Sequence, residues 1–156
     1  MEPTFRLPIG LRLSQAARTV SRAFDEALDE ASGTLPVWLI LLNLKIQRPA
    51  SQRELAEAVG VREATLTHHL NAMDARGLVT RERDPVNRRI HVVRLTEAGE
   101  AAFLRLREVA FAFDAKLRAG LTDADLDSLD GLLGQLTANV GGAGDGSPPW
   151  TGLAET

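Results

Sequence analysis

The sequence predicts a mainly helical α+β fold that contains one small β-hairpin. Apolar residues recur at three- and four-residue spacing over most of the chain, which is the period of helices packed on one side. After Gly77 the period changes, because LVTRER and RIHVVRL alternate apolar and charged residues as paired strands do. At 156 residues the chain suits one compact unit and is short for two full domains.

Composition places the chain among ordinary globular proteins and excludes several classes of function. Hydrophobic residues make up 44% and charged residues 25% of the sequence. No run of about 18 uncharged apolar residues is present to span a bilayer, and the N-terminus lacks a signal-peptide pattern. We therefore expect a cytoplasmic protein with no membrane partner. The chain has no cysteine, which excludes disulfides, thiolate metal sites and thiol redox sensors.

Two helices are expected before residue 50. The first helix is expected over residues 10–30, where apolar residues at helical spacing form a stripe along one face. An N-terminal arm over residues 1–9 precedes it. Thr34 can cap the second helix, and Pro36 suits its first turn. This second helix, PVWLILLNLKI, is apolar nearly all round, which predicts that it lies in the middle of a core with Trp38 packed there.

The segment SQRELAEAVG opens a helix-turn-helix. Ser51 and Glu54 have the spacing of a capping box, and Gly60 suits the left-handed residue that ends a helix. A second short helix is expected from about Arg62 to Arg76. Two short helices joined by a tight turn predict that the second is a recognition helix.

Positive charge is concentrated in the hairpin that follows. From Ala75 to Leu95 the chain has six arginines and two acidic residues, a net +4, whereas the remaining 12 basic and 19 acidic residues sum to −7. Such a localised positive segment is typical of contact with a phosphate backbone. On charge alone, a solvated arginine-rich hairpin explains it equally well.

The outward face of the recognition helix carries small or neutral polar residues. With Leu66 at the centre of the buried face and about 100° per residue, His69 turns back toward the edge of the core. The residues expected to point away or lie at the flanks are Ala64, Thr65, Thr67, His68 and Asn71. Side chains of these types can approach base edges, where Asn pairs with adenine and Thr methyls contact thymine methyls.

Two further helices are expected at the C-terminal end. Thr96 can cap a helix that runs to about Gly120, and Thr122 can cap a last helix whose leucines recur at near-heptad spacing. Residues 141–156 lack periodicity and are expected to be disordered.

The chain resembles the MarR family of transcriptional regulators. The resemblance is carried by LPVWLILLNL, by SQRELAEAVGVREATLTHHLNAMDARGLVTRE and by DPVNRRIHVVRLTEAG, within a single unit over residues 10–140. It implies a winged helix-turn-helix lobe over residues 34–95 and dimerisation helices over residues 10–32 and 97–140. The apolar content of these helices exceeds what one small lobe covers, which also favours a homodimer.

The resemblance also implies roles for the wing and for an effector. The family's wing usually has an Asp two residues before an Arg, whereas here Asn87 precedes Arg88 and Arg89. Asp84 is close enough to substitute for the missing carboxylate. Both arginines are candidate DNA contacts, although Arg89 could instead only brace the hairpin. Many members bind small aromatic or anionic molecules.

Candidate residues for lining such an effector cleft are Arg18, Arg22 and Trp38. A Trp on an apolar helix is more often part of the core.

Other readings of the sequence have less support. His68 and His69 are adjacent, not at the four-residue spacing that places two metal ligands on one helical face. HHLNAMD has four residues between the histidine pair and Asp74, whereas the HHxxxD acyltransferase signature has three. No cofactor motif is present in the sequence. We therefore expect neither an enzyme nor a cofactor or metal site.

The sequence favours a sequence-specific DNA-binding regulator that binds double-stranded DNA as a homodimer. The resemblance implies a ligand-responsive repressor with a pseudo-palindromic operator. The alternative is a winged helix used for protein docking or dimerisation without DNA binding.

Overall fold

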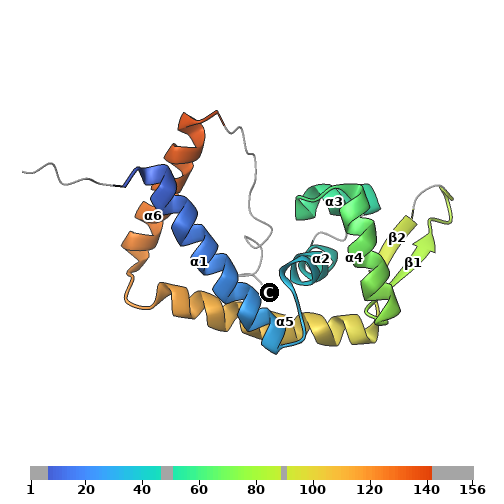
Figure 1. Cartoon of the computed structure of the whole chain (residues 1–156). Helices are drawn as coiled ribbons and strands as arrows, with labels where there is room; N and C mark the ends of the chain where they lie inside the picture. Colours follow the sequence, from blue (N-terminus) through green and yellow to red (C-terminus); the bar gives the residue numbers. More distant parts are fainter. Residues whose placement is uncertain (1–6, 47–50, 89–90, 142–156) are drawn as a thin grey trace, which may run out of the picture.

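The computed structural model describes residues 7–46, 51–88 and 91–141 (Figure 1). The predicted tail beyond residue 141 lies outside these residues, as do Arg89 and most of the N-terminal arm. The elements in order are α1 (Ile9–Glu30), α2 (Leu35–Ile46), α3 (Gln52–Val59), α4 (Glu63–Ala75), β1 (Val79–Arg83), β2 (His91–Leu95), α5 (Glu97–Arg118) and α6 (Asp123–Asn139). This order confirms the predicted α+β fold. No helix in the described ranges is long and apolar enough to cross a membrane.

Helix α2 is the centre of the core. Seven of its residues are buried: Val37, Trp38, Ile40, Leu41, Leu42, Asn43 and Leu44. It contacts α1, α3, α4, α5 and β2, so its apolar surface is covered from several directions, as the sequence predicts. The buried Asn43 side chain donates a hydrogen bond to the Leu39 carbonyl oxygen, 2.8 Å away.

The predicted helix caps are present. The side-chain oxygens of Thr34, Ser51, Thr96 and Thr122 each accept a hydrogen bond from the backbone N–H three residues later, at 3.0–3.4 Å. Gly60 ends α3 with a left-handed φ of 77°. At the start of α6, hydrogen bonds from the Thr122 backbone N–H and hydroxyl lower the pKa of Asp125. This carboxylate therefore supports the cap at neutral pH, and its contribution is lost as the pH falls through the lowered pKa.

The wing is an antiparallel hairpin in which Val79 pairs with Leu95, Arg81 with Val93 and Arg83 with His91. Opposite residues share a face, and on this face Val79 and Val93 are buried. The outer end of the same face, with Arg83 and His91, is exposed. The hairpin is therefore rooted in the core and leaves it toward its tip.

The root of the wing is packed tightly against the start of α5. The Thr96 hydroxyl donates to the Gly77 carbonyl oxygen at 2.6 Å, and the Thr96 backbone N–H donates to that of Leu78 at 3.1 Å. A Cβ at Gly99 would clash with the Leu78 carbonyl oxygen. Only glycine lets α5 begin this close to the wing.

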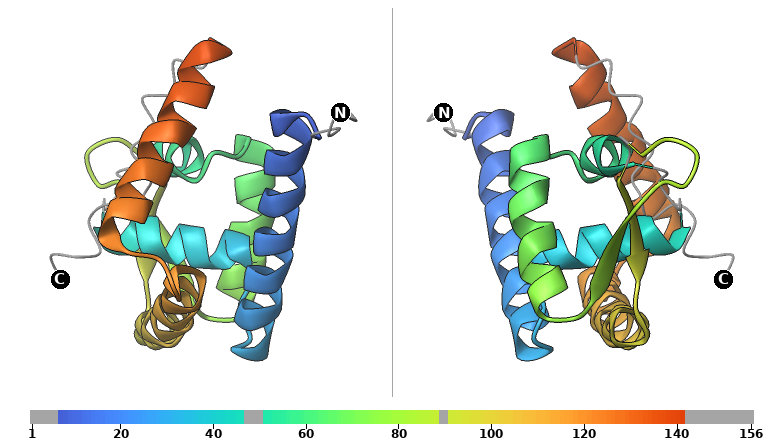
Figure 2. Two further views of the ribbon diagram at one scale, coloured as in Figure 1. Left: turned by 90° about the vertical axis from the view of Figure 1, so that its left-hand side faces the viewer. Right: turned by 90° about the vertical axis from the view of Figure 1, so that its right-hand side faces the viewer.

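The helices α1 and α6 diverge from α5 on the side away from the wing, as Figures 1 and 2 show. Phe24 of α1 stacks on Phe113 of α5 with ring centroids 4.9 Å apart, and Leu28 is the one buried residue of α1. No residue of α6 is buried. The large exposed apolar side chains of α1 and α6 include Leu11, Leu13, Val20, Leu129, Leu132 and Leu133.

We predict that Gly99→Ala lowers the free energy of unfolding by about 1–3 kcal/mol, because the added methyl must displace backbone at the root of the wing. The matched control is Gly131→Ala in α6, where a Cβ meets no atom within 4 Å. That change is expected to be neutral or to stabilise the helix by up to about 1 kcal/mol. Urea denaturation of both variants checks this. Equal stability of the two would contradict the close packing described for Gly99.

Candidate nucleic-acid interface

One side of α4 packs into the core and the other is exposed. Leu66, Leu70 and Met73 are buried, and His69 is half-buried at the edge of the core, as predicted. The five residues that we identified as candidate readers are all exposed: Ala64, Thr65, Thr67, His68 and Asn71. The local sequence thus sets the orientation of the helix, because three large apolar side chains at helical spacing fix which side faces outward.

The exposed side of α4 has hydrogen-bonding groups but no formal charge on these five residues. The exposed Thr67 uses its hydroxyl proton within the helix, donating to the Glu63 carbonyl oxygen at 2.9 Å. The rings of His68 and His69 meet edge to face with centroids 5.8 Å apart. The Asn71 amide has two donors and an acceptor for an external partner. This surface can therefore form hydrogen bonds at close range without attracting or repelling charge.

The wing loop is held by a carboxylate. One oxygen of Asp84 accepts hydrogen bonds from the backbone N–H groups of Val86, at 2.8 Å, and Asn87, at 2.7 Å. Asp84 thus braces the turn through the backbone, and over the described residues it forms no ion pair with Arg88. Arg88 itself is exposed in the turn, whereas Arg89 lies outside the described residues.

Three of the arginines in the basic segment have partners inside the protein. Arg81 of β1 pairs with Asp74 of α4 at 3.1 Å, and Arg94 pairs with Glu82 across the hairpin at 3.7 Å. Arg76 donates to the Ser32 carbonyl oxygen in the turn between α1 and α2, at 3.0 Å. All six arginines contribute equally to the net charge of the segment, but these three already have partners inside the protein.

Asp74 is a positioning residue that the sequence analysis did not assign. Its carboxylate ties the C-terminal end of α4 to the inner face of β1 through Arg81, whose side chain is 24% exposed. The signal in the sequence was a carboxylate in the last turn of the recognition helix, followed by an arginine early in the next strand. These two residues can be identified as a pair only from the fold, because β1 must run back past α4 to bring Arg81 to Asp74.

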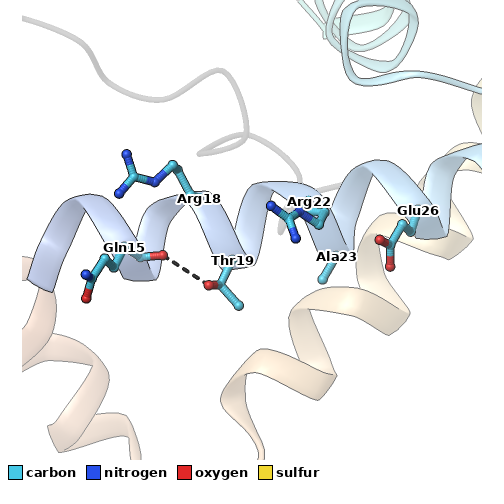
Figure 3. A pocket seen from close by; sticks show the side chains of 6 residues that line it. All are labelled: Gln15, Arg18, Thr19, Arg22, Ala23 and Glu26. Atoms are coloured by element: carbon cyan, nitrogen blue, oxygen red, sulfur yellow. Dashed lines mark hydrogen bonds between the residues drawn. The ribbon is translucent and has the colours of Figure 1, made fainter.

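Arg18 and Arg22 lie on α1, far along the chain from the wing. They line an open hollow of about 550 Å³ together with Gln15, Thr19, Ala23 and Glu26 (Figure 3). Trp38 is not among these residues. It is 3% exposed and stacks on Phe103, with ring centroids 5.8 Å apart and planes at 12°. The structure therefore brings the two arginines together and places Trp38 in the core.

Acidic and histidine side chains do not converge into a metal site in the part of the chain that the structure describes. No three of them are grouped so that they could hold an ion.

Comparison with known proteins agrees with this geometry. Residues 34–91 match the model of the MarR family. The transcriptional repressor CouR bound to a 23-mer DNA duplex is 27% identical, with a TM-score of 0.75 over 83% of this chain and 92% of that chain. A probable transcriptional regulator from Pseudomonas aeruginosa is 29% identical, with a TM-score of 0.71 over 83% of this chain and 96% of that chain.

The reduced form of MarR from E. coli shares the fold at 22% identity, with a TM-score of 0.70 over 85% of this chain and 98% of that chain. The matched segment, residues 34–91, contains the α2 core, the helix-turn-helix and the first strand of the wing. The chain thus carries a MarR-family winged helix-turn-helix domain over residues 34–91.

Proposed function

We propose that the protein is a sequence-specific DNA-binding transcriptional regulator. The observation that carries the proposal is the uncharged, exposed side of α4, which lies beside a wing rich in arginine. Neutral hydrogen-bonding side chains suit the base edges of a major groove, and arginines suit the phosphates and minor groove that border it. CouR, a structural relative, is described as a repressor and was solved on a DNA duplex.

Within this proposal the exposed residues have different tasks. His68 and Asn71 offer donors and acceptors for base edges, and Thr65 and Thr67 offer methyl groups for contact with thymine. Ala64 is small enough to let the helix approach closely. Arg88 reaches from the wing to the backbone or the minor groove, and we assign Arg89 the same role from the sequence.

We further propose that the protein acts as a homodimer through residues 10–32 and 97–140. The support is the exposed apolar surface of α1 and α6, together with the absence of any buried residue in α6. Large apolar side chains gathered on the surface of two helices are costly in water unless a partner covers them. A two-fold dimer would present two α4 helices to half-sites about one helical turn apart on a pseudo-palindrome.

A ligand-responsive repressor is the form of regulation that we propose. CouR from Rhodococcus jostii RHA1 was also solved bound to p-coumaroyl-CoA, a molecule with both an aromatic ring and negative charge. In this chain, Arg18 and Arg22 lie four residues apart on α1 and line one hollow, where their guanidinium groups suit an anionic effector. Trp38 is buried against Phe103, so it can contact an effector only in an arrangement in which α2 moves away from α5.

The rival function is a winged helix that docks proteins without binding DNA. The arginine-rich wing favours the DNA-binding proposal, and salt dependence separates the two. Binding to a DNA fragment that weakens steeply with salt supports a DNA-binding protein. Absence of salt-dependent binding to a pool of duplexes and to the DNA flanking its own gene would favour the docking module.

We expect His68→Ala and Asn71→Ala to change base preference more than affinity for unrelated DNA, because base contacts specify and phosphate contacts position. Selection from a randomised duplex library measures the preference, and each lost contact is expected to cost about 1–3 kcal/mol of discrimination at its base pair. Gln15→Ala, which truncates an exposed polar side chain of α1 outside the proposed DNA-binding surface, is the control. An unaltered selected site in both α4 variants would rule out their assignment as readers.

The dimer prediction uses the two sides of α6. Leu133→Glu should shift the protein toward monomer in sedimentation equilibrium, because a charge would be buried in the proposed interface. Gln135→Glu adds the same charge about 200° around the helix and should leave the dimer intact. If both variants sediment as the wild type does, α6 is not in the interface.

For the effector, isothermal titration of the protein with simple aromatic acids should give measurable heat that Arg18→Ala/Arg22→Ala removes. Arg12→Ala is the control, since Arg12 is exposed on α1 but does not line the hollow. Heat that persists in the double variant would place the ligand elsewhere, and no heat from the wild-type protein would count against an aromatic acid effector.

A further inference from the structure

We infer that Arg62 and Arg83 bind DNA phosphates on either side of the recognition surface. The inference rests on the proposed DNA-binding function and adds two contacts that the sequence analysis did not assign. It rests on the surroundings of the basic side chains in the lobe, residues 34–95. Five of those that the structure describes have an internal partner: Lys45, Arg53, Arg76, Arg81 and Arg94.

Three arginines of the lobe have no such partner. Within the described residues Arg62, Arg83 and Arg88 form no ion pair or side-chain hydrogen bond, and all three are exposed. Arg88 is already assigned to DNA as part of the wing loop. The remaining two carry full positive charges that nothing described in the protein uses.

Arg62 occupies a position that local stability disfavours. It is the N-cap residue of α4, with φ −71° and ψ 148°, and its side chain makes no capping hydrogen bond. Four other helices, α2, α3, α5 and α6, begin with a Ser or Thr that caps them. Arginine lacks the short acceptor that a cap needs, and a cation at this end opposes the helix dipole. The residue therefore costs helix stability, and an external anion would explain its use there.

Arg83 extends the inner face of the wing. On β1 it shares a face with Val79, which is buried, and with Arg81, which reaches Asp74 on α4. This face is therefore the one turned toward the recognition helix. Arg83 is two residues nearer the tip, where the strand has left the core and the side chain is exposed.

The two arginines border the same surface. Arg62 is at the N-terminal end of α4, and β1 leads from the C-terminal end of α4 back toward the level of its N-terminal end (Figure 1). The uncharged side of α4 thus has a free guanidinium at its start and another on the adjacent wing. Guanidinium groups bind phosphate oxygens through paired hydrogen bonds, and phosphates line both edges of a groove whose base edges face the helix.

The test compares four variants that each remove one positive charge. Arg62→Gln and Arg83→Gln remove free arginines, whereas Arg53→Gln and Arg94→Gln remove exposed arginines that are paired with Glu57 and Glu82. The affinity of each dimer for a wild-type-selected duplex is measured across a salt series. Each phosphate contact contributes about 0.9 to the slope of log K against log salt. Each variant dimer lacks two such contacts, one per subunit, so we expect each free-arginine variant to lose a slope of about 1.8. Each control variant should retain the wild-type slope.

A second variant separates DNA contact from a structural role. Arg62→Ser supplies a capping side chain, so it should raise the melting temperature by a few degrees while it weakens binding to all duplexes. If Arg62 is merely structural, Arg62→Ser should instead lower the melting temperature and the affinity together.

The two proposals fail in different ways. If the wild-type protein binds no DNA in a salt-dependent manner, the proposed function fails and the arginine assignment fails with it. If the wild type binds, but Arg62→Gln and Arg83→Gln have the same salt slope as the two controls, only the assignment of these arginines is overturned.

Discussion

The need to cover α2 on every side determines the rest of the structure. A helix that is apolar all round is stable in water only when other elements surround it. Here α1, α3, α4, α5 and β2 do so. Because α3 and α4 each use one side for this packing, the opposite side of α4 is left exposed at a fixed angle. The recognition surface is thus a consequence of the way in which the core is closed.

The wing depends on that same core for its position. Val79 and Val93 anchor the hairpin, and the close approach of Gly99 to Leu78 fixes where α5 begins beside it. The ion pair between Asp74 and Arg81 then joins the wing to α4. Arginines in this region therefore divide into those that hold the lobe together and those that remain free to attract phosphate. Charge on the lobe serves both purposes.

Much of the fold and of the recognition surface was predictable from the sequence, because local chemistry determines it. The Ser and Thr caps, the left-handed Gly60 and the buried face through Leu66 follow from short-range spacing, and the structure confirms them. Which arginines have a partner inside the protein was not predictable, because only the tertiary fold brings the partners of Arg76 and Arg81 close to them. Trp38 could not be separated from Arg18 and Arg22 by spacing alone. Their separation depends on how α2 sits within the core.

The central claim is that α4 and the wing together form the surface that binds DNA. Amide hydrogen exchange of the full chain, with and without a saturating selected duplex, tests it most directly. The account predicts that added protection is concentrated in peptides covering residues 62–71 and 83–91, while the already buried α2 changes little. Protection confined to α1 and α6, or an unchanged exchange pattern in α4 at saturating DNA, would contradict it.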